Sequence, residues 1–170
     1  PRRRLAVVGA AVLALLGART IARNPVWRDS ATVARALYAE HPESYRAQWD
    51  AAELSLLQGD TAAAADHFRL AHRLWPHSAA LLTAYGRFLT ATGEADEGIP
   101  LLERARLALP LSVTTERALA EAYLGAGQPA RALEAVDRLT RMAGDDPSTA
   151  ALRQRAAEAL RATDSIPEEM

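Results

Sequence analysis

Helix-breaking and turn-forming residues repeat along this chain at a constant spacing of 34 residues. Three prolines keep this spacing, and three glycines keep it independently. They are Pro42, Pro76 and Pro110, and Gly59, Gly93 and Gly127. Since Gly suits turns with positive φ and Pro ends helices, the two series predict a repeated helix–turn–helix unit. Such a unit cannot bury its apolar face alone, so we expect neighbouring units to stack.

The residues between these glycines and prolines follow the same period. Small residues recur at one position in each predicted helix, and larger apolar residues recur four positions later in the second helix. The first small set is Ala52, Gly86 and Ala120, the second is Ala64, Gly98 and Ala132, and the larger set is Phe68, Leu102 and Val136. Small residues let two helices approach closely, and larger ones fill the space between them. The pattern therefore describes packing and carries no chemistry.

These residues resemble the tetratricopeptide repeat family over roughly residues 24 to 147. The second repeat matches the family pattern best, with Leu82, Tyr85, Gly86, Leu89, Gly93, Gly98, Leu102, Ala105 and Pro110 at pattern positions. The resemblance implies an all-α fold, a right-handed α-solenoid of about three helix hairpins. We expect a half repeat over 24–42, repeats over 43–76, 77–110 and 111–147, a capping helix over 148–162 and a flexible tail over 163–170.

Local residues place the helix ends within these repeats. The predicted helices cover 29–41, then 43–57 with 61–75, 78–91 with 95–109, 112–125 with 129–142, and finally 148–162. Asp60, Ser78 and Ser148 are expected N-caps, because their side chains can accept a backbone hydrogen bond. Pro129 suits the first turn of its helix.

Composition excludes several functional classes. The 20 basic residues nearly balance the 21 acidic ones, and the net charge of −1 argues against a nucleic-acid partner. The absence of Cys excludes disulfides, Cys-ligated zinc and a thiol nucleophile. Five of the basic residues lie at or before Arg23, where there are no acidic residues. The chain therefore has a basic, apolar N-terminal segment and an acidic body.

The N-terminal segment has three interpretations, which the residues leave open. Arg2, Arg3 and Arg4 precede an uncharged run of 14 residues, 5–18. That run gives about 21 Å of helix, and extension to Ala22 gives about 27 Å, against a hydrocarbon core of about 30 Å. We expect residues 1–23 to form a transmembrane or signal-anchor helix that contacts the membrane through residues 5–22. A cleaved signal peptide and a buried helix are the alternatives.

The positive-inside rule then sets the location of the body. It places the three arginines in the cytoplasm and the repeats on the extracytoplasmic, periplasmic side. Residues 19–29, which read RTIARNPVWRD, also resemble the junction after the last span of transmembrane and tetratricopeptide-repeat O-mannosyltransferase-like membrane proteins. This resemblance implies an alternative function, the substrate-presenting C-terminal region of a polytopic glycosyltransferase, with catalytic residues upstream of Pro1. Trp27 is either an anchor at the membrane interface or the first core residue of the half repeat.

The repeats show no constellation that predicts catalysis. Three histidines are spaced five residues apart: His67, His72 and His77. No Asp or Glu lies four residues from any of them, which is the spacing that a metal site on one helix uses. The repeats contain no Gly-rich phosphate-binding loop, and no nucleophile elbow can be placed. We therefore expect no enzyme activity in this region, no metal and no cofactor.

The family resemblance implies that the first helices of the repeats line a concave groove. The candidate ligand-binding residues on these helices are Arg46, Trp49, Glu53, Thr83, Arg87, Arg117 and Glu121. An exposed Trp beside an Arg is typical of a binding hot spot, and the alternative is that Trp49 packs under the half repeat. The mixed charge does not match the basic clamp by which some family members hold acidic C-terminal peptides.

The predicted function is a membrane-tethered scaffold that binds a protein or peptide in this groove. We expect Glu substitutions at Arg87 and Arg117 to weaken the ligand without lowering thermal stability.

Overall fold

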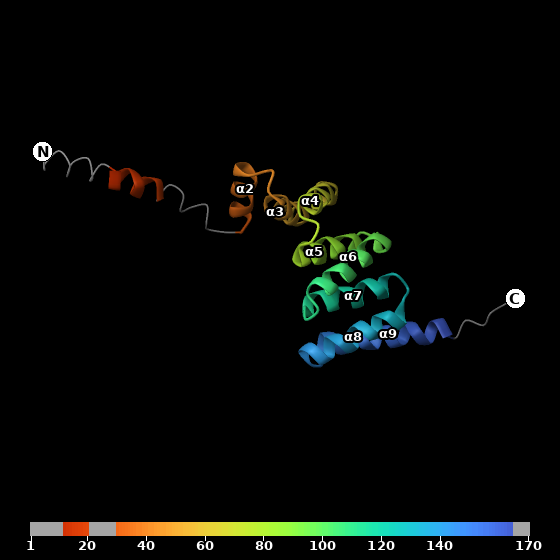
Figure 1. The fold of residues 1–170 in the computed structure, drawn as a ribbon. Coiled ribbons are helices and arrows are strands. Elements are labelled where there is room, and N and C mark those ends of the chain that lie inside the picture. Colours follow the sequence, from red (N-terminus) through yellow and green to blue (C-terminus); the bar gives the residue numbers. More distant parts are fainter. Residues whose placement is uncertain (1–11, 21–29, 165–170) are drawn as a thin grey trace, which may run out of the picture. The chain divides into compact units, whose positions relative to one another are not determined.

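The computed structural model describes residues 12–20 and 30–164 (Figure 1). Within these residues all regular secondary structure is helical, which confirms the predicted all-α class. The chain divides into two compact units, residues 1–74 and residues 75–170. The helix ends lie within two residues of the predicted ones throughout 30–164.

Residues 12–20 are helical, and the side chains of Leu13, Leu15 and Leu16 are exposed. Among the described residues, no helix combines the length and the apolar character that crossing a membrane requires. Much of the predicted membrane segment and Trp27 lie outside the described residues, so the membrane helix and the two roles of Trp27 stay predictions. The end of the predicted tail, 165–170, lies outside them too.

The first unit contains α2 (Ser30–Glu40), α3 (Tyr45–Leu57) and α4 (Thr61–Leu74). Helix α3 packs against both of the others. The buried apolar side chains described in this unit are mostly small: Ala34, Ala47, Ala51, Ala52, Ala64, Phe68 and Ala71. Because alanines dominate the interface between α3 and α4, the two backbones can lie close together around the ring of Phe68.

The second unit, as far as the structure describes it, contains five helices: α5 (Ala79–Ala91), α6 (Ala95–Ala108), α7 (Val113–Gly125), α8 (Pro129–Ala143) and α9 (Pro147–Asp164). Each helix packs against the next, and α7 also contacts α5 and α9. The alternate helices α5, α7 and α9 therefore lie side by side, as the first helices of successive hairpins do. Leu152 and Ala156 of α9 are buried in the core of this unit, which confirms α9 as a helix that covers the last hairpin.

The same glycine turn ends the first helix of every hairpin. Gly59, Gly93 and Gly127 have φ angles of +78°, +91° and +67°. The N–H of the residue after each glycine donates to the carbonyl five residues earlier, at 2.9, 2.7 and 2.8 Å. These bonds and the bond from each glycine N–H to the carbonyl three residues earlier form a Schellman motif, which favours glycine at the left-handed position. Turn chemistry thus explains the glycine period.

The small residues predicted to let helices approach do so most clearly between α5 and α6. A Cβ added at Gly98 would lie 2.7 Å from the carbonyl oxygen of Gly86, and one added at Gly86 would lie 2.7 Å from Leu102 Cγ. The equivalent alanines of the other hairpins are at most 1% exposed. The same holds for the larger side chains Phe68, Leu102 and Val136. The predicted packing of small and large residues is therefore confirmed.

Two of the three predicted N-caps are confirmed and one is wrong. Asp60 accepts a hydrogen bond from the Ala63 N–H at 2.9 Å, and Ser78 accepts one from the Leu81 N–H at 3.3 Å. Helix α9, however, begins at Pro147, so its cap is Asp146, which accepts from the Thr149 N–H at 2.7 Å. Ser148 instead donates its hydroxyl to the Asp146 carboxylate at 2.7 Å. Because Pro147 takes the first helical position, the cap is Asp146, two residues before the predicted one.

Candidate functional site

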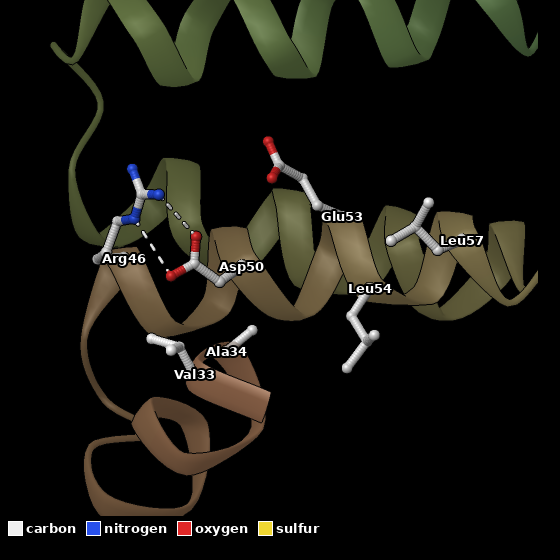
Figure 2. Close-up of a pocket in the computed structure, with 7 residues that line it drawn as sticks. All are labelled: Val33, Ala34, Arg46, Asp50, Glu53, Leu54 and Leu57. Atoms are coloured by element: carbon white, nitrogen blue, oxygen red, sulfur yellow. Dashed lines mark hydrogen bonds and ion pairs between the residues drawn. The ribbon is translucent and has the colours of Figure 1, made fainter. Parts of the chain in front are cut away.

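A pocket of about 350 Å³ opens on the first unit, along α2 and α3 (Figure 2). Two of its lining residues come from α2 and five from α3. They are Val33 and Ala34, and Arg46, Asp50, Glu53, Leu54 and Leu57. The five positions on α3 follow the spacing of a single helix face. The pocket therefore combines aliphatic side chains with one cationic and two anionic groups.

Arg46 and Asp50 form a two-pronged ion pair on this face (Figure 2). Arg46 Nε donates to Asp50 Oδ2 at 3.2 Å, and Nη2 lies 2.9 Å from Oδ1. Both carboxylate oxygens of Asp50 are thus already bound. Asp50 was not among the residues predicted for the groove, although its i, i+4 spacing from Arg46 is one that favours an ion pair on a helix.

The guanidinium of Arg46 also covers the ring of Trp49, with 4.6 Å between the guanidinium carbon and the ring centroid. Trp49 is half-buried, and its indole nitrogen is buried without a hydrogen-bond partner in the described residues. The half-buried ring thus has a cation over its face, and its two interpretations, ligand binding and packing under the half repeat, stay predictions.

Glu53 differs from its two charged neighbours. Its side chain is exposed, and within residues 12–20 and 30–164 it forms no ion pair. Leu57, one turn further along, is 81% exposed. The pocket thus keeps one uncommitted carboxylate beside an exposed aliphatic side chain.

The position that Trp49 occupies is filled by Thr83 in α5 and by Arg117 in α7, and both contact the next alternate helix. Thr83 is 7% exposed, and its hydroxyl oxygen lies 2.9 Å from that of Thr115 in α7. Arg117 is half-buried, donates to Ser148, and lies 3.3 Å from Asp146 at the start of α9. Thr83 is therefore inaccessible to a ligand in this structure.

Arg117 also requires a correction. We expected Arg117→Glu not to lower stability, but the Arg117 guanidinium binds Ser148 and Asp146, the N-cap of α9. Reversal of its charge would place Glu beside Asp146, whose pKa the bonds from Ser148 and Thr149 and the charge of Arg117 already hold well below its usual range. The substitution should therefore loosen α9. Arg87 and Glu121, by contrast, are exposed and form no ion pair among the described residues.

Two polar clusters in the second unit were also missed. In the first, the Tyr123 hydroxyl donates to Glu103 at 2.7 Å, and Arg131 binds the same carboxylate. The guanidinium carbon of Arg131 lies 4.3 Å from the Tyr123 ring centroid. Burial, and then the hydrogen bond to Glu103, raise the pKa of Tyr123 to about 12. The apolar pattern of this helix predicted that the Tyr123 ring is buried, but it did not indicate which residue the hydroxyl contacts.

The second cluster is an ion pair at the interface of α7 and α8. Glu116 is 1% exposed, and its carboxylate lies 3.0 Å from Arg138 Nε. A buried carboxylate needs such a partner. Glu116 lies in the first turn of α7, where an acidic residue is common, so its residue type and place do not by themselves indicate burial.

Of the histidines, His67 has the best-defined contacts. His67 Nδ1 lies 2.8 Å from Gln48 Oε1, and its ring meets Tyr38 edge-on with centroids 5.4 Å apart. In the described part of the chain, no three His, Asp or Glu side chains gather in a way that could hold a metal ion.

Two sequence profiles, both described as tetratricopeptide repeat, match the chain. One covers residues 55–114, and the other covers residues 26–79 and 117–170. The chain belongs to the tetratricopeptide repeat family. No curated protein matches its sequence.

Solved tetratricopeptide repeat structures have the same fold. TTC0263, a thermophilic TPR protein of Thermus thermophilus, is 24% identical with a TM-score of 0.62, over 93% of this chain and 94% of that one. The first TPR of Spaghetti (RPAP3), bound to the HSP90 peptide SRMEEVD, is 11% identical with a TM-score of 0.63, over 69% and 96%. A chain of the APC/C hetero-tetramer Cut9–Hcn1 is 18% identical with a TM-score of 0.66; the match covers 72% of this chain and only 25% of that chain.

In this tetratricopeptide repeat protein the predicted groove residues lie on the first helices α3, α5 and α7. Arg46, Trp49 and Glu53 belong to the first unit, and the other four belong to the second. That all seven line one groove stays a prediction, as does the resemblance of residues 19–29 to O-mannosyltransferase-like proteins.

Proposed function

We propose that this tetratricopeptide repeat protein is a non-catalytic scaffold that binds a protein or peptide partner through its first helices. One observation carries the proposal: the exposed face of α3 presents Arg46 over the ring of Trp49, next to a pocket. Aromatic residues and Arg dominate the energetics of protein interfaces, because they supply a large contact area with little conformational freedom. A repeat whose only task was to stack would not require either residue at this place.

The family supports the same class of function. Repeats of this kind bury a continuous core between neighbouring helices and leave one side of the first helices available to partners. The Spaghetti domain was solved with a bound peptide, and the Cut9–Hcn1 structure is an assembly of proteins. Identities below 25% support the fold and the interaction class, while the partner itself has to come from the residues of this chain.

The experiment is a selection from an immobilised library of random peptides with the purified chain. Trp49→Leu keeps an apolar side chain but removes the aromatic surface, and it should retain at least about tenfold less peptide than the wild type. Trp75→Leu is the matched control, because Trp75 is 54% exposed in the turn after α4 and does not line the pocket. Equal retention by all three proteins, or retention by none, would contradict the proposal.

Membrane tethering is a second part of the proposal, and it depends on the sequence. The uncharged run 5–18 between arginines favours an anchor, with the repeats on the extracytoplasmic side. Alkaline extraction of membranes should leave the chain in the pellet, and deletion of residues 5–18 should release it. Equal extraction of the chain with and without residues 5–18 would contradict the membrane anchor. The alternative is that the chain is the C-terminal region of a polytopic glycosyltransferase. The sequence that precedes Pro1 tests this alternative.

A further inference from the structure

We infer that the pocket on α3 binds an arginine side chain of the partner peptide, flanked by apolar residues. This inference deepens the proposed function and depends on it. Its starting point is the charge inside the pocket, where Asp50 and Glu53 face a single cation, Arg46. The lining is therefore net negative by one charge, and it favours a cationic occupant over an acidic one.

The two carboxylates are not equivalent. Both oxygens of Asp50 are bound by Arg46, which leaves Glu53 as the carboxylate that a ligand can reach. A carboxylate with two open oxygens matches the planar fork of a guanidinium, which donates two parallel hydrogen bonds. Lysine offers a single point charge with a tighter hydration shell. The geometry therefore favours arginine over lysine.

The rest of the lining fits the stem of such a side chain. Val33, Ala34, Leu54 and Leu57 contribute aliphatic surface to the same lining. Arginine buries its methylene groups along such surfaces while its charged head stays hydrated. At about 350 Å³ the pocket is near the lower end of ligand-site volumes, which suits one or two side chains.

A purely structural explanation of these residues is insufficient. The positions of Arg46, Asp50 and Leu57 are occupied in the next two repeats by Ala80, Ala84 and Ala91, and by Thr114, Ala118 and Gly125. Helices α5 and α7 carry those small residues and still pair with α6 and α8, so the charges of α3 are not needed for a hairpin to form. An i, i+4 surface pair would explain Arg46 with Asp50, but neither Glu53 nor the exposed Leu57.

The test uses the full chain and four probe peptides. These are acetyl-Leu-Arg-Leu-amide and its versions with lysine, citrulline or glutamate at the centre, titrated while amide chemical shifts of α3 are followed by NMR. Citrulline has nearly the shape of arginine without its charge. We expect the arginine peptide to bind at least about tenfold more tightly than the citrulline or glutamate peptides, with lysine between them, and added salt to weaken it.

Glu53→Gln should lower the affinity for the arginine peptide about tenfold. Glu121→Gln is the matched control, because Glu121 is an exposed Glu at the equivalent position of α7, and it should leave the affinity unchanged. Equal binding of arginine and citrulline peptides, equal effects of the two substitutions, or no binding of any probe would overturn the inference. Self-association that Glu53→Gln abolishes would assign the pocket to a second copy of the chain and would also overturn it.

The proposed function can fail independently of this inference. If the peptide library yields Trp49-dependent binders that lack arginine and ignore Glu53→Gln, the scaffold stands and the arginine pocket is wrong. If the library yields no binder, the proposed function itself is contradicted.

Discussion

Replacing Gly98 with Ala tests the close approach of α5 and α6. The added Cβ would lie 2.7 Å from the carbonyl oxygen of Gly86 and 2.7 Å from Thr90 Cγ2. That oxygen belongs to the backbone of α5 and accepts the Thr90 hydroxyl at 3.0 Å, so it cannot move aside without moving the helix. Ala in place of Gly inside a helix ordinarily gains about 1 kcal/mol. Overpacking of a tight interface costs about 1–3 kcal/mol, and a backbone contact this short belongs near the upper end.

We therefore expect Gly98→Ala to lower the free energy of unfolding by about 1–2 kcal/mol, despite its better helix propensity. Equilibrium urea unfolding followed by far-ultraviolet circular dichroism measures this difference. Gly125→Ala is the control, because Gly125 is helical and a Cβ there meets no atom within 4 Å. It should gain up to about 0.5 kcal/mol near the helix end. A Gly98→Ala protein as stable as the wild type, beside a Gly125→Ala protein that gains, would refute the packing argument.

Three further substitutions address the core and its polar groups. Phe68→Ala removes a side chain that is 1% exposed and should cost about 3–5 kcal/mol in urea unfolding; a loss below about 1 kcal/mol would mean that the ring is not packed between helices. Arg138→Ala strands the buried Glu116 carboxylate and should cost about 3 kcal/mol at neutral pH, whereas the double variant with Glu116→Gln should recover part of that loss. Tyr123 has its pKa raised from 10.0 to about 12, so the stability it contributes is complete below pH 10 and is lost as the pH rises toward 12. Tyr123→Phe should flatten this alkaline loss in thermal unfolding, and an unchanged profile would show that the phenol is not protected by the fold.

The sequence predicted the fold well because local chemistry determines it. A glycine in a Schellman turn and a small residue at each helix crossing act within one hairpin, and both recur with the period. Either feature can be read from residue type alone, since only Gly fits the positive φ of the turn without strain. The capping error at α9 is a case in which two residue types, Asp146 and Ser148, could each serve, and only the position of Pro147 decides between them.

The candidate site was predicted less well because its residues depend on contacts between repeats. The sequence placed Thr83 and Arg117 on a free face of their helices, but the next alternate helix lies against that position in both cases. A helix wheel has no information on which neighbour covers which part of its surface. The ion pair of Asp50 with Arg46 lay within reach of sequence reasoning, whereas the pocket beside it requires the position of α2 relative to α3.

Partner recognition in such a protein has to come from positions that vary while the packing stays constant. One such position holds Arg46, Ala80 and Thr114 in the three repeats. Another holds Glu53, Arg87 and Glu121, and all six residues are exposed. Since the small and large core positions keep their character through the same repeats, these exposed positions are free of the constraint that fixes the core. Within the second unit the charge changes sign from Arg87 on α5 to Glu121 on α7, so a uniformly acidic or uniformly basic peptide that followed both helices would meet repulsion at one of them. A partner that satisfies both helices must itself carry charges of both signs.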